Sequence, residues 1–365
     1  MLTATELSTA ALSPDGAHLV TACFDGTFAL WQTATGKLLR RWQRPKARGV
    51  LRWSPDNTHL AFRSFRPDGA YTVTALNPLT GAARIVADLD PDDGASLGFD
   101  WAPNGRTLIF ADTEPADGTT RGFLSVVPLS DDETLTELPR EQARRRVEVP
   151  RGVPLTRVFA TRTGFFCAHV GEAALLGLDG TVLWAHPTAS DDHAMSPARN
   201  AVLSFHQTVP HLRRILGEPV ALEASQPMGN QRAWSVDGSH LVLNASLAEG
   251  AGYAVFREHR QVAAVPDAQP LVPRTFSELG YFYLDGWSNI ALNGTGSHFV
   301  LADNETGELR GWALGPSSKL LWSAELDDLS FVQWNGSTII AASATQVMFV
   351  DGASGRILAR GNVAG

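Results

Sequence analysis

The chain has few cysteines and no long apolar run. Only two of its 365 residues are cysteines, and two thiols so far apart in sequence do not indicate a disulfide framework. Cys23 and Cys167 each end or follow an apolar run, which predicts buried thiols. No stretch approaches the length of about 18 apolar residues that crosses a membrane, and the first residues lack the features of a signal peptide. We therefore expect a soluble cytoplasmic protein without membrane insertion.

Helical periodicity and catalytic motifs are also missing. No segment repeats its apolar residues at helical spacing, and only residues 133–146 have a helix-forming composition. The sequence contains no nucleophile elbow, phosphate loop, paired-cysteine metal motif or His-Glu-x-x-His helix. The formal net charge is −8, so we expect no nucleic acid partner. These absences favour a noncatalytic protein without a cofactor, although single residues from several repeats can still assemble an active site.

One short turn recurs eight times along the chain and leads each time into an apolar strand. The best copies read Ser-Pro-Asp-Gly or nearly so, and they begin at Ser13, Ser54, Ala102 and Ser235. Weaker copies begin at Thr161, Ser196, Asn293 and Asn335. A period of about 20–50 residues is typical of stacked or circular repeats.

The first unit indicates what each repeat forms. Strands are predicted, with turns between them, at residues 8–12, 18–23, 27–32 and 37–43. Four antiparallel strands in about forty residues make one blade of a β-propeller. Eight units favour an all-β, circular propeller with eight blades over residues 1–365, interrupted by insertions at about 130–149 and 270–287. Seven blades are the alternative, with the fourth or fifth unit as an elaboration of its neighbour.

The segment Thr21-Ala22-Cys23-Phe24-Asp25-Gly26-Thr27-Phe28-Ala29-Leu30-Trp31-Gln32 resembles a WD repeat. Asp25 falls at the family's turn aspartate and Trp31 at its tryptophan, while Gln32 stands where the family has Asp. The later units are similar to looser bacterial propellers that carry a Ser-Pro-Asp-Gly turn. The resemblance implies a circular propeller and, most often, a scaffold for other macromolecules.

A group of basic residues surrounds a tryptophan in the fourth predicted strand. Arginine forks suit carboxylate or phosphate oxygens, and an indole ring can stack. We therefore predict that an acidic partner contacts Arg41, Trp42, Arg44, Arg48 and Arg66. The alternative is an outer strand that charge keeps soluble.

The insertion at 270–287 is rich in aromatic residues, which commonly anchor interfaces. We predict that Tyr281 and Tyr283 contact a partner. The alternative is a strand that places these rings in the core. The other insertion, 130–149, is acidic at its start and basic at its end, and loops beyond a scaffold's needs are often functional.

Two groups of residues resemble metal ligands. Asp88, Asp90 and Asp92 alternate as in a calcium loop, but the glycine comes one place late and Phe99 stands where a bidentate Glu belongs. The four histidines that precede a second strand occupy one phase of the repeat, so we expect exposed turn residues on separate blades rather than converging ligands. These are His18, His59, His240 and His298.

The sequence thus predicts a noncatalytic scaffold that binds a protein or peptide partner through one face of the propeller. The alternative is a propeller hydrolase or lyase with a metal-assisted site at the central channel.

Overall fold

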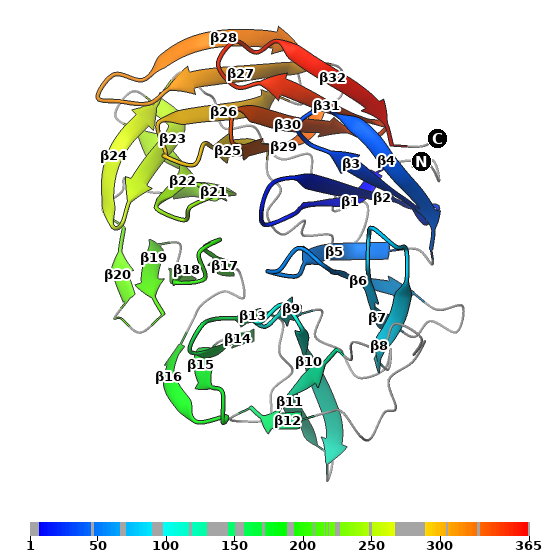
Figure 1. Cartoon of the computed structure of the whole chain (residues 1–365). Helices are drawn as coiled ribbons and strands as arrows, with labels where there is room; N and C mark the ends of the chain where they lie inside the picture. The colour runs from blue at the N-terminus through cyan, green and yellow to red at the C-terminus, as the bar shows by residue number, and fades with distance from the viewer. Residues whose placement is uncertain are drawn as a thin grey trace.

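The computed structural model describes residues 7–44, 47–65, 71–89, 98–116, 119–129, 145–149, 157–169, 172–187, 193–206, 209–215, 217, 219–222, 227–247, 250–266, 289–303, 306–326 and 329–363. These residues form eight four-stranded antiparallel sheets arranged as a ring, which is an eight-bladed β-propeller (Figure 1). Within each blade the strands follow chain order from the innermost to the outermost (Figure 1). The eight-blade prediction is confirmed.

The first four blades each take their strands from one continuous stretch of chain. Blade 1 contains β1 (Leu7–Leu12), β2 (His18–Cys23), β3 (Thr27–Gln32) and β4 (Lys37–Gln43). Blade 2 contains β5 (Ala47–Trp53), β6 (Leu60–Phe65), β7 (Tyr71–Leu76) and β8 (Ala83–Leu89). Blade 3 contains β9 (Phe99–Trp101), β10 (Thr107–Ala116), β11 (Thr119–Pro128) and β12 (Arg145–Glu148). Blade 4 contains β13 (Arg157–Ala160), β14 (Gly164–His169), β15 (Glu172–Gly177) and β16 (Val182–Pro187).

The remaining four blades repeat the arrangement. Blade 5 contains β17 (His193–Met195), β18 (Ala201–His206), β19 (Val209–Arg214) and β20 (Pro219–Ala221). Blade 6 contains β21 (Pro227–Trp234), β22 (His240–Leu247), β23 (Gly250–Arg257) and β24 (Arg260–Val265). Blade 7 contains β25 (Ile290–Leu292), β26 (His298–Asp303), β27 (Glu308–Ala313) and β28 (Lys319–Glu325). Blade 8 contains β29 (Leu329–Asn335), β30 (Thr338–Ser343), β31 (Gln346–Asp351) and β32 (Ile357–Asn362).

Helices are absent from the ranges given above, so none there is long and apolar enough to cross a membrane. The segment with helix-forming composition, 133–146, lies outside those ranges except for its last two residues, which belong to β12.

The recurring turn holds its shape through side-chain hydrogen bonds. Ser13 Oγ donates to Asp15 Oδ1 at 2.6 Å, and the backbone N of His18 donates to Ser13 Oγ at 2.9 Å. The copies that begin at Ser54 and Ser235 repeat both bonds. Burial alone would raise the pKa of Asp15, but the bonds from Ser13 and a backbone amide outweigh it and lower the pKa. The turn therefore supplies its own partners, which explains why so short a motif can start a strand in blade after blade.

The turn histidines lie between blades rather than in solvent. Each is half-buried, and three of them place their ring against a tryptophan that lies in the first strand of the next blade. The ring centroids are 6.0–6.5 Å apart in the pairs His18–Trp53, His59–Trp101 and His298–Trp334. The expectation of exposed residues was therefore incomplete, because the next blade covers one side of each ring.

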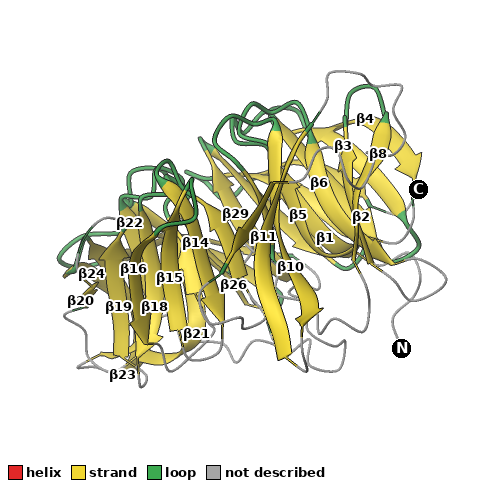
Figure 2. Cartoon of the chain, turned by 90° about the horizontal axis from the view of Figure 1, so that it is seen from below, coloured by secondary structure: helices red, strands yellow, loops and turns green. Residues whose placement is uncertain are grey.

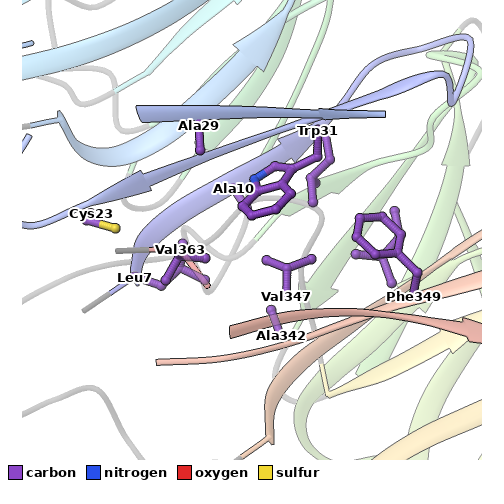
Figure 3. Close-up of a cluster of buried hydrophobic side chains, with 11 residues drawn as sticks. Leu7, Ala10, Cys23, Ala29, Trp31, Ala342, Val347, Phe349 and Val363 are labelled. Atoms are coloured by element: carbon purple, nitrogen blue, oxygen red, sulfur yellow. The ribbon is translucent and has the colours of Figure 1, made fainter. Parts of the chain in front are cut away.

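Blades 8 and 1 close the ring by side-chain packing (Figure 3). Trp31 of blade 1 and Phe349 of blade 8 belong to one buried cluster. A backbone hydrogen bond joins the same blades, from Leu7 N to Ala344 O at 2.7 Å. No strand of the described chain crosses from one end to complete the sheet of the other. The apolar cluster and hydrogen bonds between the two blades thus hold the ring closed.

Candidate interaction surface

The turns define two faces of the propeller. In a four-stranded antiparallel blade, the turn between the first and second strands and the turn between the third and fourth lie at the same end. Figure 2 shows the described turns of many blades gathered at that end of the strands. We call this side of the ring the turn face.

Exposed aliphatic side chains are concentrated on the turn face. Eleven large hydrophobic residues are exposed in the described part of the chain. Every one lies in a turn of this face or in an outermost strand close to it. They are Leu39, Leu79, Leu178, Val182, Leu183, Val220, Val236, Val262, Leu320, Leu321 and Leu358. Scattered single apolar residues are normal on protein surfaces, so the informative observation is that several of these described residues share one structural position.

Five of these residues occupy the same structural position. In five outermost strands the register with the neighbouring strand skips one residue, which is the extra residue of a β-bulge. In every one of the five blades that residue is an aliphatic one with 42–46% of its surface exposed. The five are Leu39, Leu183, Val262, Leu321 and Leu358, and we call them the aliphatic rim. A sixth bulge residue, Val86 of blade 2, is buried.

The bulge explains how an aliphatic residue reaches solvent here. An extra residue leaves the hydrogen-bond ladder and re-aims its side chain, and bulges are frequent next to functional sites. More than half of each rim side chain is covered, which accounts for an apolar residue at the position. The remainder faces solvent near the turn face and is available for contact.

The predicted basic group on β4 binds neighbouring blades. Arg44 donates to the backbone O of Gly81 in blade 2, and Arg41 Nη2 donates to Asn362 O in blade 8 at 2.8 Å. Trp42 is 9% exposed and belongs to the apolar cluster between blades 1 and 2. Arg40 donates to a carbonyl of the same turn as Gly81. These contacts show that Trp42, Arg41 and Arg44 connect blade 1 to its neighbours. Their contact with a partner stays a prediction.

Two other outermost strands place a tryptophan in the same way. Trp322 Nε1 of β28 donates to Gly352 O in blade 8 at 3.2 Å, and Trp184 Nε1 of β16 donates to Ile215 O in blade 5 at 2.8 Å. In each case the acceptor lies at the turn before the last strand of the next blade. Trp42 contacts the corresponding turn at Gly81, where the carbonyl accepts from Arg44 instead.

Several residues that the sequence predicts as partner contacts or metal ligands lie away from β4 or outside the described chain. Arg48 lies in β5, the innermost strand of blade 2, whereas β4 is the outermost strand of blade 1. Asp88 lies in β8, and nothing further is described of the side chain of either residue. The predicted residues outside the described chain are Arg66, Asp90, Asp92, Tyr281 and Tyr283.

A buried charged cluster joins four blades, and the sequence reasoning missed it. Asp100 of β9 is fully buried and forms an ion pair with Arg199, from the first turn of blade 5. Arg199 Nη2 donates to Asp100 Oδ1 at 3.0 Å, and Arg199 Nη1 donates to Ala160 O of blade 4 at 2.9 Å. Arg52 of blade 2 adds a longer contact of 3.7 Å to Asp100. The only sign of the cluster in the sequence was Arg199 itself, which stands at the turn position where the copy at Ser13 has glycine.

The cluster is structural in its chemistry. Burial alone would raise the pKa of Asp100, but Arg199 and Arg52 outweigh burial and lower it. A backbone N–H from Ala160 also donates to this carboxylate at 2.9 Å. A carboxylate that is fully buried and held ionised by two cations is poorly suited to exchange protons with a substrate.

Metal-ligating and nucleophilic groups do not converge in the ranges that the structure covers. Among them, no three His, Cys, Asp or Glu residues lie close enough to hold a metal ion. Cys23 and Cys167 are free thiols and buried, as the sequence predicts. Burial raises the pKa of Cys23 to about 12, and it also raises that of Cys167. Both therefore stay protonated and unreactive at neutral pH.

Comparison with known proteins gives a fold and no family. No protein family model matches the chain, and no curated protein matches it. Its structure is similar to a crystal structure of the computationally designed Ika8 protein, with 15% identity, 94% of each chain covered and a TM-score of 0.58.

Two further structures are similar as well. A eukaryotic initiation factor shares 12% identity over 99% of this chain and 89% of its own, with a TM-score of 0.61. KlHsv2 with loop 6CD replaced by a Gly-Ser linker shares 10% identity over 88% of this chain and 99% of its own, with a TM-score of 0.53. At such identities the similarity concerns the fold alone, and membership of the WD-repeat family stays a prediction. The chain is an eight-bladed β-propeller, and the large aliphatic residues that are exposed in its described part lie on or near the turn face.

Proposed function

We propose that this protein is a noncatalytic interaction scaffold that binds a protein or peptide partner through its turn face. The observation that carries the proposal is the aliphatic rim, in which five blades expose an aliphatic residue at the same bulged position. Propellers commonly mediate protein interactions, and a rigid ring loses little conformational entropy when it binds.

A triple variant of the rim tests the proposal. The substitutions Leu39→Ser, Leu321→Ser and Leu358→Ser remove three exposed side chains from blades 1, 7 and 8. Covering the exposed part of each leucine contributes about 1 kcal/mol, so the three together change the dissociation constant roughly 100-fold.

The matched control carries three substitutions at the other end of the same strands. Gln43→Ala, Glu325→Ala and Asn362→Ala replace exposed residues far from the turn face. A partner is first captured from a lysate of the source cells with the full chain, then purified, and its dissociation constant is measured by calorimetry. The proposal predicts a large loss for the rim variant and none for the control. Equal affinities for both variants contradict it.

The hydrolase or lyase remains the alternative prediction. No observation in the structure favours it, since the buried carboxylate of Asp100 is fully engaged by arginines. We also propose that the predicted partner residues on β4 act indirectly, by fixing the strand that presents Leu39.

A further inference from the structure

Three outermost strands begin with the same residue pattern. A cation, at the first position of the strand or directly before it, is followed by two aliphatic residues, of which the second belongs to the aliphatic rim. The three segments are Lys319-Leu320-Leu321 at β28, Arg356-Ile357-Leu358 at β32 and Lys37-Leu38-Leu39 at β4. The chain has only three lysines, and two of them stand here. Neither of the two other rim residues completes the pattern, because Leu183 follows Thr181, and Val262 follows Arg260 with the polar Gln261 between them.

These three strands are neighbours on the outside of the ring (Figure 1). Blades 8 and 1 are joined at this level by the bond from Arg41 Nη2 to Asn362 O, and β32 contacts β4. Blades 7 and 8 are joined by Trp322, whose indole donates to Gly352 O and lies against the turn that precedes β32. We call the surface over β28, β32 and β4 the basic sector.

The charge of the basic sector is opposite to that of the whole chain. Lys37, Lys319 and Arg360 form no ion pair within the described residues, and Lys37, Lys319 and Arg360 are all exposed. Arg356 lies near Asp351, whose carboxylate accepts hydrogen bonds from Ser354. The formal net charge of the chain is nevertheless −8. This sector therefore presents exposed cations on an otherwise acidic chain.

We infer that the basic sector binds an acidic segment of a protein partner that also carries aliphatic side chains. The inference rests on the proposed function and adds the chemistry of the partner. Aliphatic side chains of the segment cover Leu39, Leu321 and Leu358, and its carboxylates pair with the flanking cations.

The test selects peptides by their chemistry. A library of random peptides of about 16 residues, which reach about 50 Å when extended, is displayed on phage and selected on the full chain. It is counter-selected on the variant Lys37→Ser, Lys319→Ser, Arg360→Ser. The enriched pool is expected to be acidic and rich in aliphatic residues. A neutral or basic pool, or a pool that the counter-selection does not change, overturns the inference.

The best peptide is then titrated by fluorescence anisotropy against three variants. We expect at least tenfold weaker binding to the cation variant and to the rim variant Leu39→Ser, Leu321→Ser, Leu358→Ser. The matched variant Leu183→Ser, Val262→Ser changes the same bulge position on other blades, and it is expected to bind as the wild type does. Melting temperatures of all variants are compared first, and the two rim variants are expected to lose similar stability per substitution, because all five rim side chains are covered to a similar extent.

The outcomes separate the inference from the proposed function. If the rim variant loses the peptide and the cation variant keeps it, the acidic partner is excluded and the scaffold remains. If neither variant loses it, both fail. If the wild type floats with phosphatidylserine vesicles and the cation variant does not, the partner is a membrane and the inference is overturned. If the wild type forms a dimer that the cation substitutions dissociate, the partner is a second copy of this chain and the inference is overturned.

Discussion

The substitution Arg199→Met tests whether the buried charged cluster holds the inner part of the ring together. It removes the hydrogen bonds from Arg199 to Asp100, Ala160 O and Trp101 O. Asp100 then stays fully buried with the bond from Ala160 N and the longer contact to Arg52, and without its main cation. Leaving a buried charge without its main partner costs about 3–5 kcal/mol.

The expected change in melting temperature follows from the size of the chain. At about 2.1 cal/mol/K per residue, 365 residues have an unfolding entropy of about 0.8 kcal/mol/K. A loss of about 4 kcal/mol therefore lowers the melting temperature by about 5 °C in calorimetry. The control is Arg214→Met, which breaks an ion pair with Glu258 in which both side chains are mostly exposed, and it costs less than about 1 kcal/mol. Equal shifts for the two variants refute the reasoning.

The same cluster predicts a pH dependence of known sign. The pKa of Asp100 in the folded protein lies below its ordinary value of 3.8. Its stabilisation is therefore complete at neutral pH and is lost as the pH falls below that value. The difference in melting temperature between the wild type and Asp100→Asn is expected to shrink between pH 6 and pH 3, and a difference that grows contradicts this assignment.

Three further predictions concern packing, thiols and metal. Gly81 has a φ of +80°, and a Cβ there would lie 2.8 Å from Trp42 Nε1, so Gly81→Ala is expected to cost more than about 1 kcal/mol in urea unfolding. Gly294→Ala, which meets no atom within 4 Å, is the control, and an equal cost contradicts the packing assigned to Trp42. Cys23 and Cys167 are expected to react with a thiol reagent only after unfolding, and rapid reaction of either in the native protein shows that it is not buried. Elemental analysis is expected to find no stoichiometric divalent ion, and a bound ion counts against a noncatalytic scaffold.

Local features of the structure follow from the sequence closely. The pattern at 37–43 predicts an outer strand, and β4 has the same bounds. The turn at Ser13 predicts the start of β2 at His18, because the turn makes its bonds within a few residues. Regularities of this kind are visible in one sequence because each repeat builds its own blade.

Contacts between blades could not be predicted in the same way. Arg199 binds Asp100 across blade 4, and the sequence around either residue does not indicate this contact. The histidine–tryptophan pairs carried a signal, since His18 and Trp53 recur in phase as His59 and Trp101. The bulges could not be predicted from the sequence, because skipping one residue in the register leaves the composition of an outer strand unchanged.

The most direct test of the account is the footprint of a bound partner measured by amide hydrogen exchange. On binding, exchange is expected to slow in the first halves of β4, β28 and β32, which carry the rim residues of the basic sector. The turn at Asp25 and Gly26, on the opposite face, is expected to stay unchanged. Protection confined to that opposite face would contradict the central claim that the turn face is the interaction surface.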